Sequence, residues 1–449
     1  MPEAVEISET RVSRKPLQSA SHGPRSSMNR RRFLKRATAW VAGAAVPSIV
    51  PASALGANGR VSPSNRIVIG QVGFNWIGNA HLYGFLHNSQ IQFLGACEAF
   101  APRLEATRAA IDRYYAERMG KADYKGCRTY TDFREMFAAP DIDAVVIAAP
   151  DHWHAAMSIE AARAGKDIYC EKPMTRTIAE ARAVVQAVRR HGRVFQTGSQ
   201  QRSEFGGMFR RAVELVRSGR IGRIVSAYVG VGGPPRPYDM PAEPIPEGLD
   251  WEMWLGPAPW LPYNSACCPE VRWRWFSEFC GGGFSDMGAH HFDIVQWALD
   301  MDESGPVEII APDEEDHRPL TFKYASGATV YHGGKIDVDL RGTDGRIMVA
   351  REYLRSEPPG ILQEPLGAGD AHLDRGRDHR DDWLHCIRTR QRPIADVEIG
   401  CRTATLCQLG NIAFELKRPL RWDPRMECFV DDPAAERLKS RAMRDPWSI

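Results

Sequence analysis

The chain has 449 residues, of which 43% are hydrophobic and 25% charged, the balance of a folded, two-domain protein rather than a disordered or membrane-embedded one. Lys and Arg number 58 and Asp and Glu 56, so no excess of either sign would draw the chain to nucleic acid or to an anionic membrane. A small neutral or weakly charged molecule is therefore the expected ligand.

The N-terminal residues differ from the rest of the chain. Residues 30–35 read RRRFLK and precede a run of small apolar residues that Pro47 and Pro51 interrupt, which is too short and broken to span a membrane. A basic start, a short apolar run and a small-residue end are typical of an export signal, and the paired arginines resemble the twin-arginine signal. We expect residues 1–57 to be a leader and signal peptide and the mature chain to be periplasmic or otherwise exported; the alternative is a basic, unstructured tail.

The next predicted elements are a strand, a glycine-rich turn and a helix. The strand is the β-branched run 66–72, and apolar residues at helical spacing follow the turn. Gly73 and Gly78 occupy the first and third glycine positions of a G-x-G-x-x-G turn, which permits a tight turn and close helix packing, and leaves helix N–H groups free for a pyrophosphate. Asn75 stands at the second position, where its side chain takes up room near the phosphates.

A second strand, residues 91–100, ends at Glu98. This carboxylate lies about 20 residues beyond the last glycine, where an acidic residue can bond the adenosine ribose hydroxyls. A carboxylate there repels a 2′-phosphate, so NAD is favoured over NADP, although Arg103 lies close enough to weaken that preference. The strand pattern therefore predicts an NAD site.

Two further strands, within 141–154 and 166–173, alternate with helices. Strands that alternate with helices indicate an α/β fold with a doubly wound parallel sheet and a ligand at the carboxyl ends of the strands. The segments 150–154 and 171–173 lie at such ends. We therefore expect residues 64–197 to form a dinucleotide-binding Rossmann domain.

The ten cysteines show no CxxC pair and no zinc-type spacing. Two adjacent cysteines are poorly placed to bind one tetrahedral ion together. We therefore expect no metal site and mostly buried thiols that pack as small hydrophobic side chains. The cysteines are Cys97, Cys127, Cys170, Cys267, Cys268, Cys280, Cys386, Cys401, Cys407 and Cys428.

From residue 198 the pattern becomes that of an α+β domain with a mostly antiparallel sheet, which we expect to bind the substrate and to extend to residue 420. Pro393 separates two predicted helices, and His379 at the start of the first could reach the substrate pocket. Residues 421–449 read as a solvent-facing tail. The predicted helices and strands of the domain lie in 212–233, 306–350 and 379–416.

Six of the twelve tryptophans lie within residues 251–297. Aromatic faces stack on the C–H faces of sugar rings, and an arginine can fork onto hydroxyls or an acid group. Arg274 and Trp275 are therefore predicted substrate contacts. The alternative is an aromatic core beneath a long loop.

Four segments together resemble the Gfo/Idh/MocA family of glucose-fructose oxidoreductases and inositol dehydrogenases. They are the glycine turn, AAPDHWH at 148–154, CEKPMT at 170–175 and GGGFSDMGAHHFD at 281–293. The resemblance covers about residues 64–420 and implies a homo-oligomer. Asn75, in place of the usual glycine, departs from the family pattern and bears on how the pyrophosphate binds.

By position, the resemblance implies catalytic roles for Lys172, Asp286 and His290. Removing a hydroxyl proton as a hydride leaves requires a base, and His290 titrates nearest to neutral pH, while Asp286 one turn earlier could orient it. Lys172 can hydrogen-bond the same oxygen and stabilise a developing alkoxide. The alternative for Asp286 and His290 is a helix N-terminal carboxylate and an exposed imidazole. His291 points about 100° away and is either a second substrate ligand or, as we favour, a packed surface residue.

The strand ends and the resemblance together define the predicted sites. The substrate site contains Lys172, Arg274, Trp275, Asp286 and His290. The cofactor site contains Gly73, Asn75, Trp76, Ile77, Gly78, Glu98, Pro150, His154, Glu171, Lys172 and Gln200.

Three functions are compatible with these residues. The first is an NAD-dependent oxidoreductase that acts on a sugar or polyol and, because free NAD is scarce outside the cytoplasm, holds its cofactor tightly. The second is a redox-neutral, NAD-dependent glycosidase that works through a transient keto-sugar. The third is a carbohydrate-binding protein without catalysis.

Overall fold

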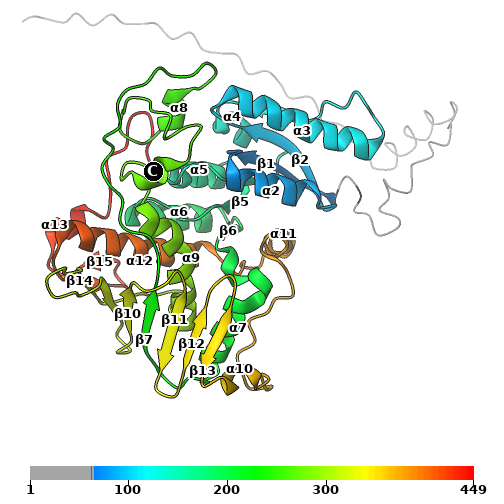
Figure 1. The fold of residues 1–449 in the computed structure, drawn as a ribbon. Helices are drawn as coiled ribbons and strands as arrows, with labels where there is room; N and C mark the ends of the chain where they lie inside the picture. The colour runs from blue at the N-terminus through cyan, green and yellow to red at the C-terminus, as the bar shows by residue number, and fades with distance from the viewer. Residues whose placement is uncertain (1–61, 63–64) are drawn as a thin grey trace, which may run out of the picture.

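The computed structural model describes residue 62 and residues 65–449, so the predicted leader and signal peptide lie outside the described residues. The first domain is built on a six-stranded parallel sheet with strand order β3-β2-β1-β4-β5-β6 (Figure 1), the doubly wound order of a dinucleotide-binding fold. Its strands are β1 Ile67–Val72, β2 Ile91–Cys97, β3 Arg128–Tyr130, β4 Ala144–Ile147, β5 Asp167–Cys170 and β6 Phe195–Thr197.

Helices cover this sheet because its central strands are apolar on both faces. The N-terminus of α6 is fixed by a capping box in which Thr177 and Glu180 exchange side-chain and backbone hydrogen bonds. The predicted α/β fold with its parallel sheet is thus confirmed. The helices are α2 Trp76–Leu86, α3 Ala101–Met119, α4 Phe133–Ala138, α5 Asp151–Arg163 and α6 Ile178–Arg190.

The second domain contains a nine-stranded sheet of order β13-β12-β11-β7-β10-β9-β8-β14-β15. Its pairs are antiparallel except for β7 with β10, as the sequence predicted. The strands are β7 Ile224–Val229, β8 Glu308–Ile310, β9 Thr321–Lys323, β10 Thr329–His332, β11 Val338–Gly342, β12 Arg346–Val349, β13 Leu354–Glu357, β14 Leu420–Asp423 and β15 Cys428–Phe429.

Two long helices, α9 and α12, pack against each other between the two sheets, and α12 also packs against α6 of the first domain (Figure 1). Apolar side chains of α9 and α12 share one core with the nine-stranded sheet. The α-helices of this part are α7 Met208–Arg217, α8 Trp251–Leu255, α9 Gly282–Ala298, α10 Gly360–Gln363, α11 His379–Thr389, α12 Val397–Leu416 and α13 Pro433–Arg437. Three short 3-10 helices complete it: η5 Gln200–Arg202, η6 Phe205–Gly207 and η7 Arg272–Trp275.

The prediction of a solvent-facing tail from residue 421 is wrong. Strand β14 pairs with β8 and extends the large sheet, and Trp422 and Phe429 are buried. The charged neighbours of these side chains concealed an apolar–polar alternation, which is the pattern of a half-buried strand. Farther on, Lys439 O accepts a hydrogen bond from Ala179 N at 2.9 Å, and Arg441 Nε pairs with Glu180 Oε1 at 2.7 Å, so this segment returns to the first domain.

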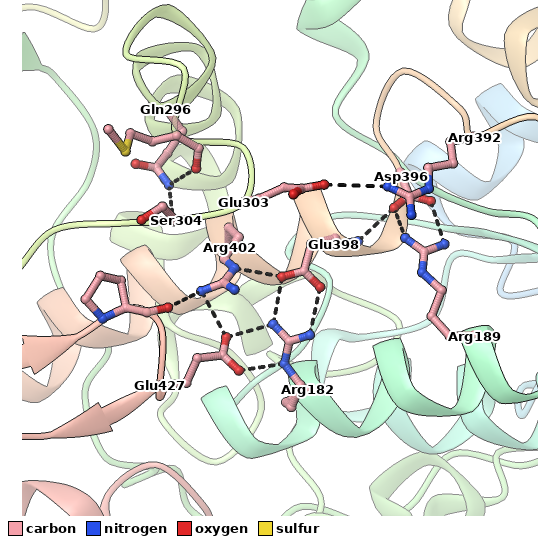
Figure 2. A network of polar contacts seen from close by, with 12 residues as sticks. Arg182, Arg189, Gln296, Glu303, Ser304, Arg392, Asp396, Glu398, Arg402 and Glu427 are labelled. Atoms are coloured by element: carbon pink, nitrogen blue, oxygen red, sulfur yellow. Dashed lines mark hydrogen bonds and ion pairs between the residues drawn. The ribbon is translucent and has the colours of Figure 1, made fainter.

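An ion-pair network joins the two domains where α6 meets α12 (Figure 2). The guanidinium of Arg182 donates to Glu398 at 2.7 and 2.8 Å and to Glu427 at 2.6 and 2.8 Å. Arg402 bonds Glu398 at 2.7 Å from the next turn of α12. Paired, forked hydrogen bonds of this kind fix relative orientation as well as adding stability, so the network holds the first domain against the helix behind the large sheet.

Replacing Arg182 with alanine should lower the free energy of unfolding by about 2 kcal/mol, because two partly buried carboxylates each lose a forked, charged partner. Urea unfolding followed by tryptophan fluorescence measures the change. Arg163→Ala is the matched control, since its pair with Glu160 is 3.7 Å long and exposed, and it should change the free energy by less than about 0.5 kcal/mol. Equal losses in both variants would contradict a locking role for the network.

Two further expectations concern the chain as a whole. All ten cysteines are unpaired, and nine of them are buried. This confirms the prediction that most of them are buried thiols that pack as small hydrophobic side chains. Among the residues that the structure describes, no helix has the length and apolar character required to cross a membrane.

Candidate active site

A cavity of about 400 Å³ lies at the carboxyl ends of β1, β2, β4 and β5 and is closed on its other side by the second domain. Ligands of doubly wound sheets bind at these strand ends. The first domain contributes the turns that follow each strand, and the second contributes α9, η7 and the loop before η7. The cavity therefore lies where the sequence placed both the cofactor and the substrate.

The glycine turn after β1 is shaped by close backbone approaches. Gly73 has φ of +86°, and a Cβ there would lie 2.5 Å from Ala148 O. A Cβ at Gly78 would overlap Gly73 O. Gly73 lines the cavity, whereas Gly78 does not, since it lies behind the turn and lets α2 pack against β1. Gly78 thus acts on the cofactor site through packing rather than by contact.

Gly78→Ala should lower the free energy of unfolding by about 1–3 kcal/mol, because the new methyl group must push α2 away from β1. It should also reduce the amount of NAD retained on purification, since the N-terminus of α2 shifts. Thermal unfolding and the nucleotide content of a denatured extract measure the two effects. Gly369→Ala is the control, because open space surrounds that position; a loss as large in the control would contradict the packing role.

Asn75, the departure from the family pattern, caps α2. Its Oδ1 accepts a hydrogen bond from Trp76 N at 2.9 Å, and its Nδ2 donates to Pro269 O at 3.0 Å. The side chain therefore lines the cavity at the helix N-terminus and ties the loop before η7 to the glycine turn. Trp76 and Ile77, also predicted for the cofactor, line the cavity beside it.

Glu98 lies at the end of β2 and lines the cavity, as predicted. Its Oε2 accepts from Phe74 N at 3.1 Å and from Arg103 at 3.4 Å, and its Oε1 accepts from Phe100 N at 3.3 Å. The carboxylate thus fixes the glycine turn while it lines the cavity. Arg103, which the sequence suggested would weaken the preference for NAD over NADP, is a direct hydrogen-bond partner of Glu98.

Glu171 and His154 line the cavity but also hold the backbone around Lys172. Glu171 Oε1 contacts His81 Nε2 at 2.7 Å and Gln200 Nε2 at 2.8 Å, while its Oε2 accepts from Lys172 N at 3.1 Å. Burial raises the pKa of Glu171, but His81 and Lys172 outweigh burial and hold it below its usual value. The predicted cofactor residues Pro150, Glu171, Lys172 and Gln200 all line the cavity.

His154 is buried, and both of its ring nitrogens contact backbone carbonyl oxygens. Its Nδ1 lies 2.7 Å from Pro173 O, and its Nε2 lies 2.9 Å from Ala149 O. Burial opposes a charge on this ring, but the Cys170 sulfur, Asp151 and the carbonyl of Pro173 raise its pKa to about 10. A charged imidazolium donates both bonds. His154 therefore joins the turns after β4 and β5 and positions the loop that carries Lys172.

Lys172, Asp286 and His290 lie together in the cavity. Lys172 Nζ donates to Asp286 Oδ1 at 2.7 Å and to Asp286 O at 2.9 Å. His290 is buried, and no described residue hydrogen-bonds to its ring nitrogens, so its buried Nδ1 has no partner. The expectation that Asp286 orients His290 is wrong in this structure, because its carboxylate bonds the ammonium of Lys172 instead.

The charges of the site set its protonation states. Burial raises the pKa of Asp286, but Lys172, Arg274 and Arg351 outweigh burial and hold it below its usual value. Burial, followed by the positive charges of Lys172 and Arg351, holds the pKa of His290 well below its usual range. At neutral pH the site therefore presents an ionised Asp286 carboxylate and a neutral His290 imidazole, which can accept a proton.

Arg274 lines the cavity as predicted, whereas Trp275 does not. Trp275 is 53% exposed, and Trp273 is the tryptophan of this segment that lines the cavity. The reason is the 3-10 geometry of η7, in which residues i and i+3 eclipse each other, so Trp275 shares the solvent face with Arg272. A helix of three residues per turn was not apparent from the sequence.

The two uncertain histidines are both structural. His291 is buried rather than at the surface, and its Nδ1 lies 3.3 Å from Gly230 O. His379 is buried outside the cavity lining, with Nε2 at 2.8 Å from Thr197 O and Nδ1 at 3.2 Å from Ser203 Oγ. Arg380, the next residue, lines the cavity instead.

Sequence reasoning missed several basic or acidic residues of the cavity, among them Glu204, Arg351 and Arg380. Glu204 precedes η6, Arg380 lies in the first turn of α11, and Arg351 lies in the turn between β12 and β13. The alternation of β12 and β13 could have located the hairpin turn, but no local signal shows that this turn reaches the active site.

These residues fit a bound dinucleotide. The N-terminus of α2 faces the cavity, Gly73 leaves the turn without a side chain, and His290, whose Nδ1 has no hydrogen-bond partner among the described residues, also lines the cavity. A helix N-terminus stabilises phosphate through its free N–H groups and its dipole. The nucleotide would be held by the turns after β1, β2, β4 and β5.

Two models of one protein family match the chain. Residues 67–199 match the GFO_IDH_MocA model of the oxidoreductase family with an NAD-binding Rossmann fold, and residues 236–449 match the model of its C-terminal alpha/beta domain. The second match extends through the residues that the sequence suggested were a tail.

Individual relatives are more distant. The chain is 29% identical to an inositol 2-dehydrogenase of Salmonella typhimurium, with 34% of this chain and 42% of that protein aligned. It is 30% identical to a glycosyl hydrolase family 109 protein of Shewanella baltica, with 36% of this chain and 38% of that protein aligned. The chain thus spans about two-fifths of the length of these relatives.

A solved structure shows the same fold over most of the chain. The WlbA dehydrogenase from Bordetella pertussis, in complex with NADH and UDP-GlcNAcA, has a TM-score of 0.56 and 20% identity, covering 80% of this chain and 98% of that one. At this identity the likeness shows the fold. Together with the two family matches, it identifies the chain as a member of the Gfo/Idh/MocA family of oxidoreductases, with an NAD-binding Rossmann domain.

Proposed function

We propose that this protein oxidises a hydroxyl group of a sugar or polyol with an NAD that it holds tightly. One observation carries the proposal: Lys172 from the first domain and His290 from the second line the same cavity at the strand ends where the dinucleotide binds. An amine and a neutral imidazole that face one cavity can act on one carbinol oxygen. The dehydrogenase relatives support the same reaction class.

When bound, NAD supplies the acceptor for a hydride. The chain itself handles the proton and the oxygen. His290, whose pKa is held low, takes the hydroxyl proton as a neutral base. Lys172, fixed by Asp286 at 2.7 Å, donates a hydrogen bond to the same oxygen and stabilises negative charge that develops on it. Asp286 thus positions Lys172.

A second function is supported by the glycosyl hydrolase family 109 relatives. In a redox-neutral glycosidase, a sugar carbon is oxidised transiently, the neighbouring C–H becomes acidic, the aglycone is eliminated, water adds and the sugar is reduced again. Lys172 and His290 would serve this scheme with the same roles. It also suits an exported protein, because no net reduction of the cofactor occurs.

The purified protein, incubated with sugars, inositols and aryl glycosides, separates these functions. We expect NAD in the denatured extract and accumulation of reduced nicotinamide with a free sugar or polyol. Release of the aglycone from an aryl glycoside without net change in nicotinamide absorbance would support the glycosidase instead. Sugar binding by a protein that contains no NAD would overturn both enzymatic readings in favour of a binding protein.

We also propose that the chain is exported by the twin-arginine route and forms a homo-oligomer. The export proposal rests on the basic and apolar pattern before residue 58, and the oligomer proposal rests on the family resemblance. Fractionation of the producing cell and light scattering of the purified protein test the two proposals. Retention in the cytoplasm would contradict the first, and a monomeric mass the second.

A further inference from the structure

Three cations lie around Asp286 at the reacting end of the cavity. Asp286 is the carboxylate that faces Lys172, Arg274 and Arg351, and these three cations lower its pKa. Lys172 forms the ion pair at 2.7 Å, while Arg274 Nε lies 3.6 Å from the same oxygen. Asp286 thus faces three cations, and Asp151 is a second carboxylate, whose pKa burial raises and Arg274 lowers by a smaller amount. The overall charge of the chain is nearly balanced, so it did not reveal this local group of cations.

Arg351 is the cation of this group that forms no ion pair with a carboxylate in the part of the chain that the structure describes. It projects from the turn between β12 and β13, where Ala350 N donates to Tyr353 O at 2.9 Å. Its guanidinium lies 4.8 Å from the centre of the Phe205 ring, and its buried Nε has no hydrogen-bond partner. A half-buried guanidinium that packs on an aromatic ring and makes no hydrogen bond retains donors for a ligand.

Three other carboxylates of the cavity, Glu171, Glu204 and Asp151, form no ion pair with Arg351 among the described residues. Glu171 accepts hydrogen bonds from three donors of the first domain. Burial raises the pKa of Glu204, and the nearby Arg380 lowers it by a smaller amount. Asp151 is buried, and burial raises its pKa.

We propose that the substrate is a sugar acid, whose carboxylate is bound by Arg351 while its reacting hydroxyl lies between Lys172 and His290. This inference rests on the proposed function and adds to it the chemical class of the substrate. The planar guanidinium of arginine matches a carboxylate through two parallel N–H···O bonds. A single unpaired arginine balances a single negative charge, so a carboxylate suits the site better than a phosphate.

Binding to the NAD-loaded protein tests the proposal with matched pairs of probes. The pairs are glucuronate with glucose, galacturonate with galactose, and mannuronate with mannose, measured by titration calorimetry. For at least one pair the acid should bind about tenfold or more tightly than the neutral sugar, the gain expected from a hydrogen-bonded charge pair. In Arg351→Met this preference should fall to less than about threefold.

Arg355→Met is the matched control. Arg355 lies on the same hairpin, is exposed, stacks on Tyr353 at 4.7 Å and does not line the cavity. It should keep the wild-type preference. Arg351→Lys retains the charge without the fork and should keep part of the preference, which covers the case in which Arg351→Met does not fold, as judged by its melting temperature.

Three results would overturn the sugar-acid proposal: no acid binds more tightly than its neutral partner, Arg351→Met keeps the preference, or the corresponding hexose 6-phosphates bind more tightly than the uronates. Failure of the proposed oxidation can be distinguished from failure of the sugar-acid proposal. If uronates bind through Arg351 but no reduced nicotinamide or aglycone forms, the reaction is wrong and the binding assignment stands. If neutral sugars are oxidised without any preference for acids, the reaction stands and the binding assignment fails.

Discussion

His290→Ala is expected to lower kcat by about 10²- to 10⁴-fold, because the variant lacks the base that takes the hydroxyl proton. NAD retention should stay unchanged, since the cofactor is held by the turns of the first domain. Stopped-flow reduction of the nicotinamide measures the rate, and a denatured extract measures the cofactor. His372→Ala is the control, as this histidine is exposed and does not line the cavity. Loss of NAD together with activity would contradict the assigned role.

The pH dependence of the wild type follows from the same residue. The neutral imidazole is the active form, so kcat/KM rises as His290 loses its proton. Because burial, Lys172 and Arg351 hold its pKa well below the usual range, the acid limb of the profile should lie below about pH 6.5, the ordinary value for histidine. The unfolded chain binds this proton more readily, so His290 also contributes to loss of stability as the pH falls below that value.

Lys172→Met is expected to lower kcat by about 10²- to 10³-fold, because the donor that stabilises the developing oxyanion is lost. Two effects should accompany the loss of rate. Asp286 loses its partner at 2.7 Å, so its pKa should rise. The acid limb set by His290 should move to higher pH, because a positive charge that lowers its pKa is removed.

The double variant Lys172→Met/Asp286→Asn separates catalysis from the repair of an unpaired charge. If Asp286 acts through Lys172, adding Asp286→Asn to Lys172→Met should change kcat by less than the single Asp286→Asn change does in the wild type. Independent, additive losses would contradict the positioning role. An acid limb that stays in place in Lys172→Met would contradict the electrostatic coupling to His290.

Much of the fold could be predicted because its signals are local. The run 66–72, the glycine turn and the alternation of strands with helices determine a parallel sheet without information from distant residues. The choice of Lys172 as a site residue also followed locally, since it lies directly after a buried strand. The predicted tail from residue 421 failed because its strand is short and its alternate residues are charged.

The remainder of the site depends on contacts between distant segments. On an isolated helix Asp286 and His290 are neighbours one turn apart, but in the folded chain the ammonium of Lys172 competes for the carboxylate and binds it. Trp275 faces solvent because its segment winds as a 3-10 helix. Arg351 reaches the cavity from a hairpin turn whose position depends on the whole nine-stranded sheet. None of these outcomes is encoded within one segment.

The return of residues 439–447 to the first domain has a consequence for synthesis of the protein. Trp447 packs 4.7 Å from the ring of Trp153, and Arg441 donates to His152 O at 3.0 Å, yet the last strand of the parallel sheet ends at Thr197. Translation of the roughly 240 residues between them takes about 10 to 50 s. During that interval the emerging sheet has its strands but lacks this cover over α5, so Trp153 and His152 gain these contacts only after the second domain has been synthesised.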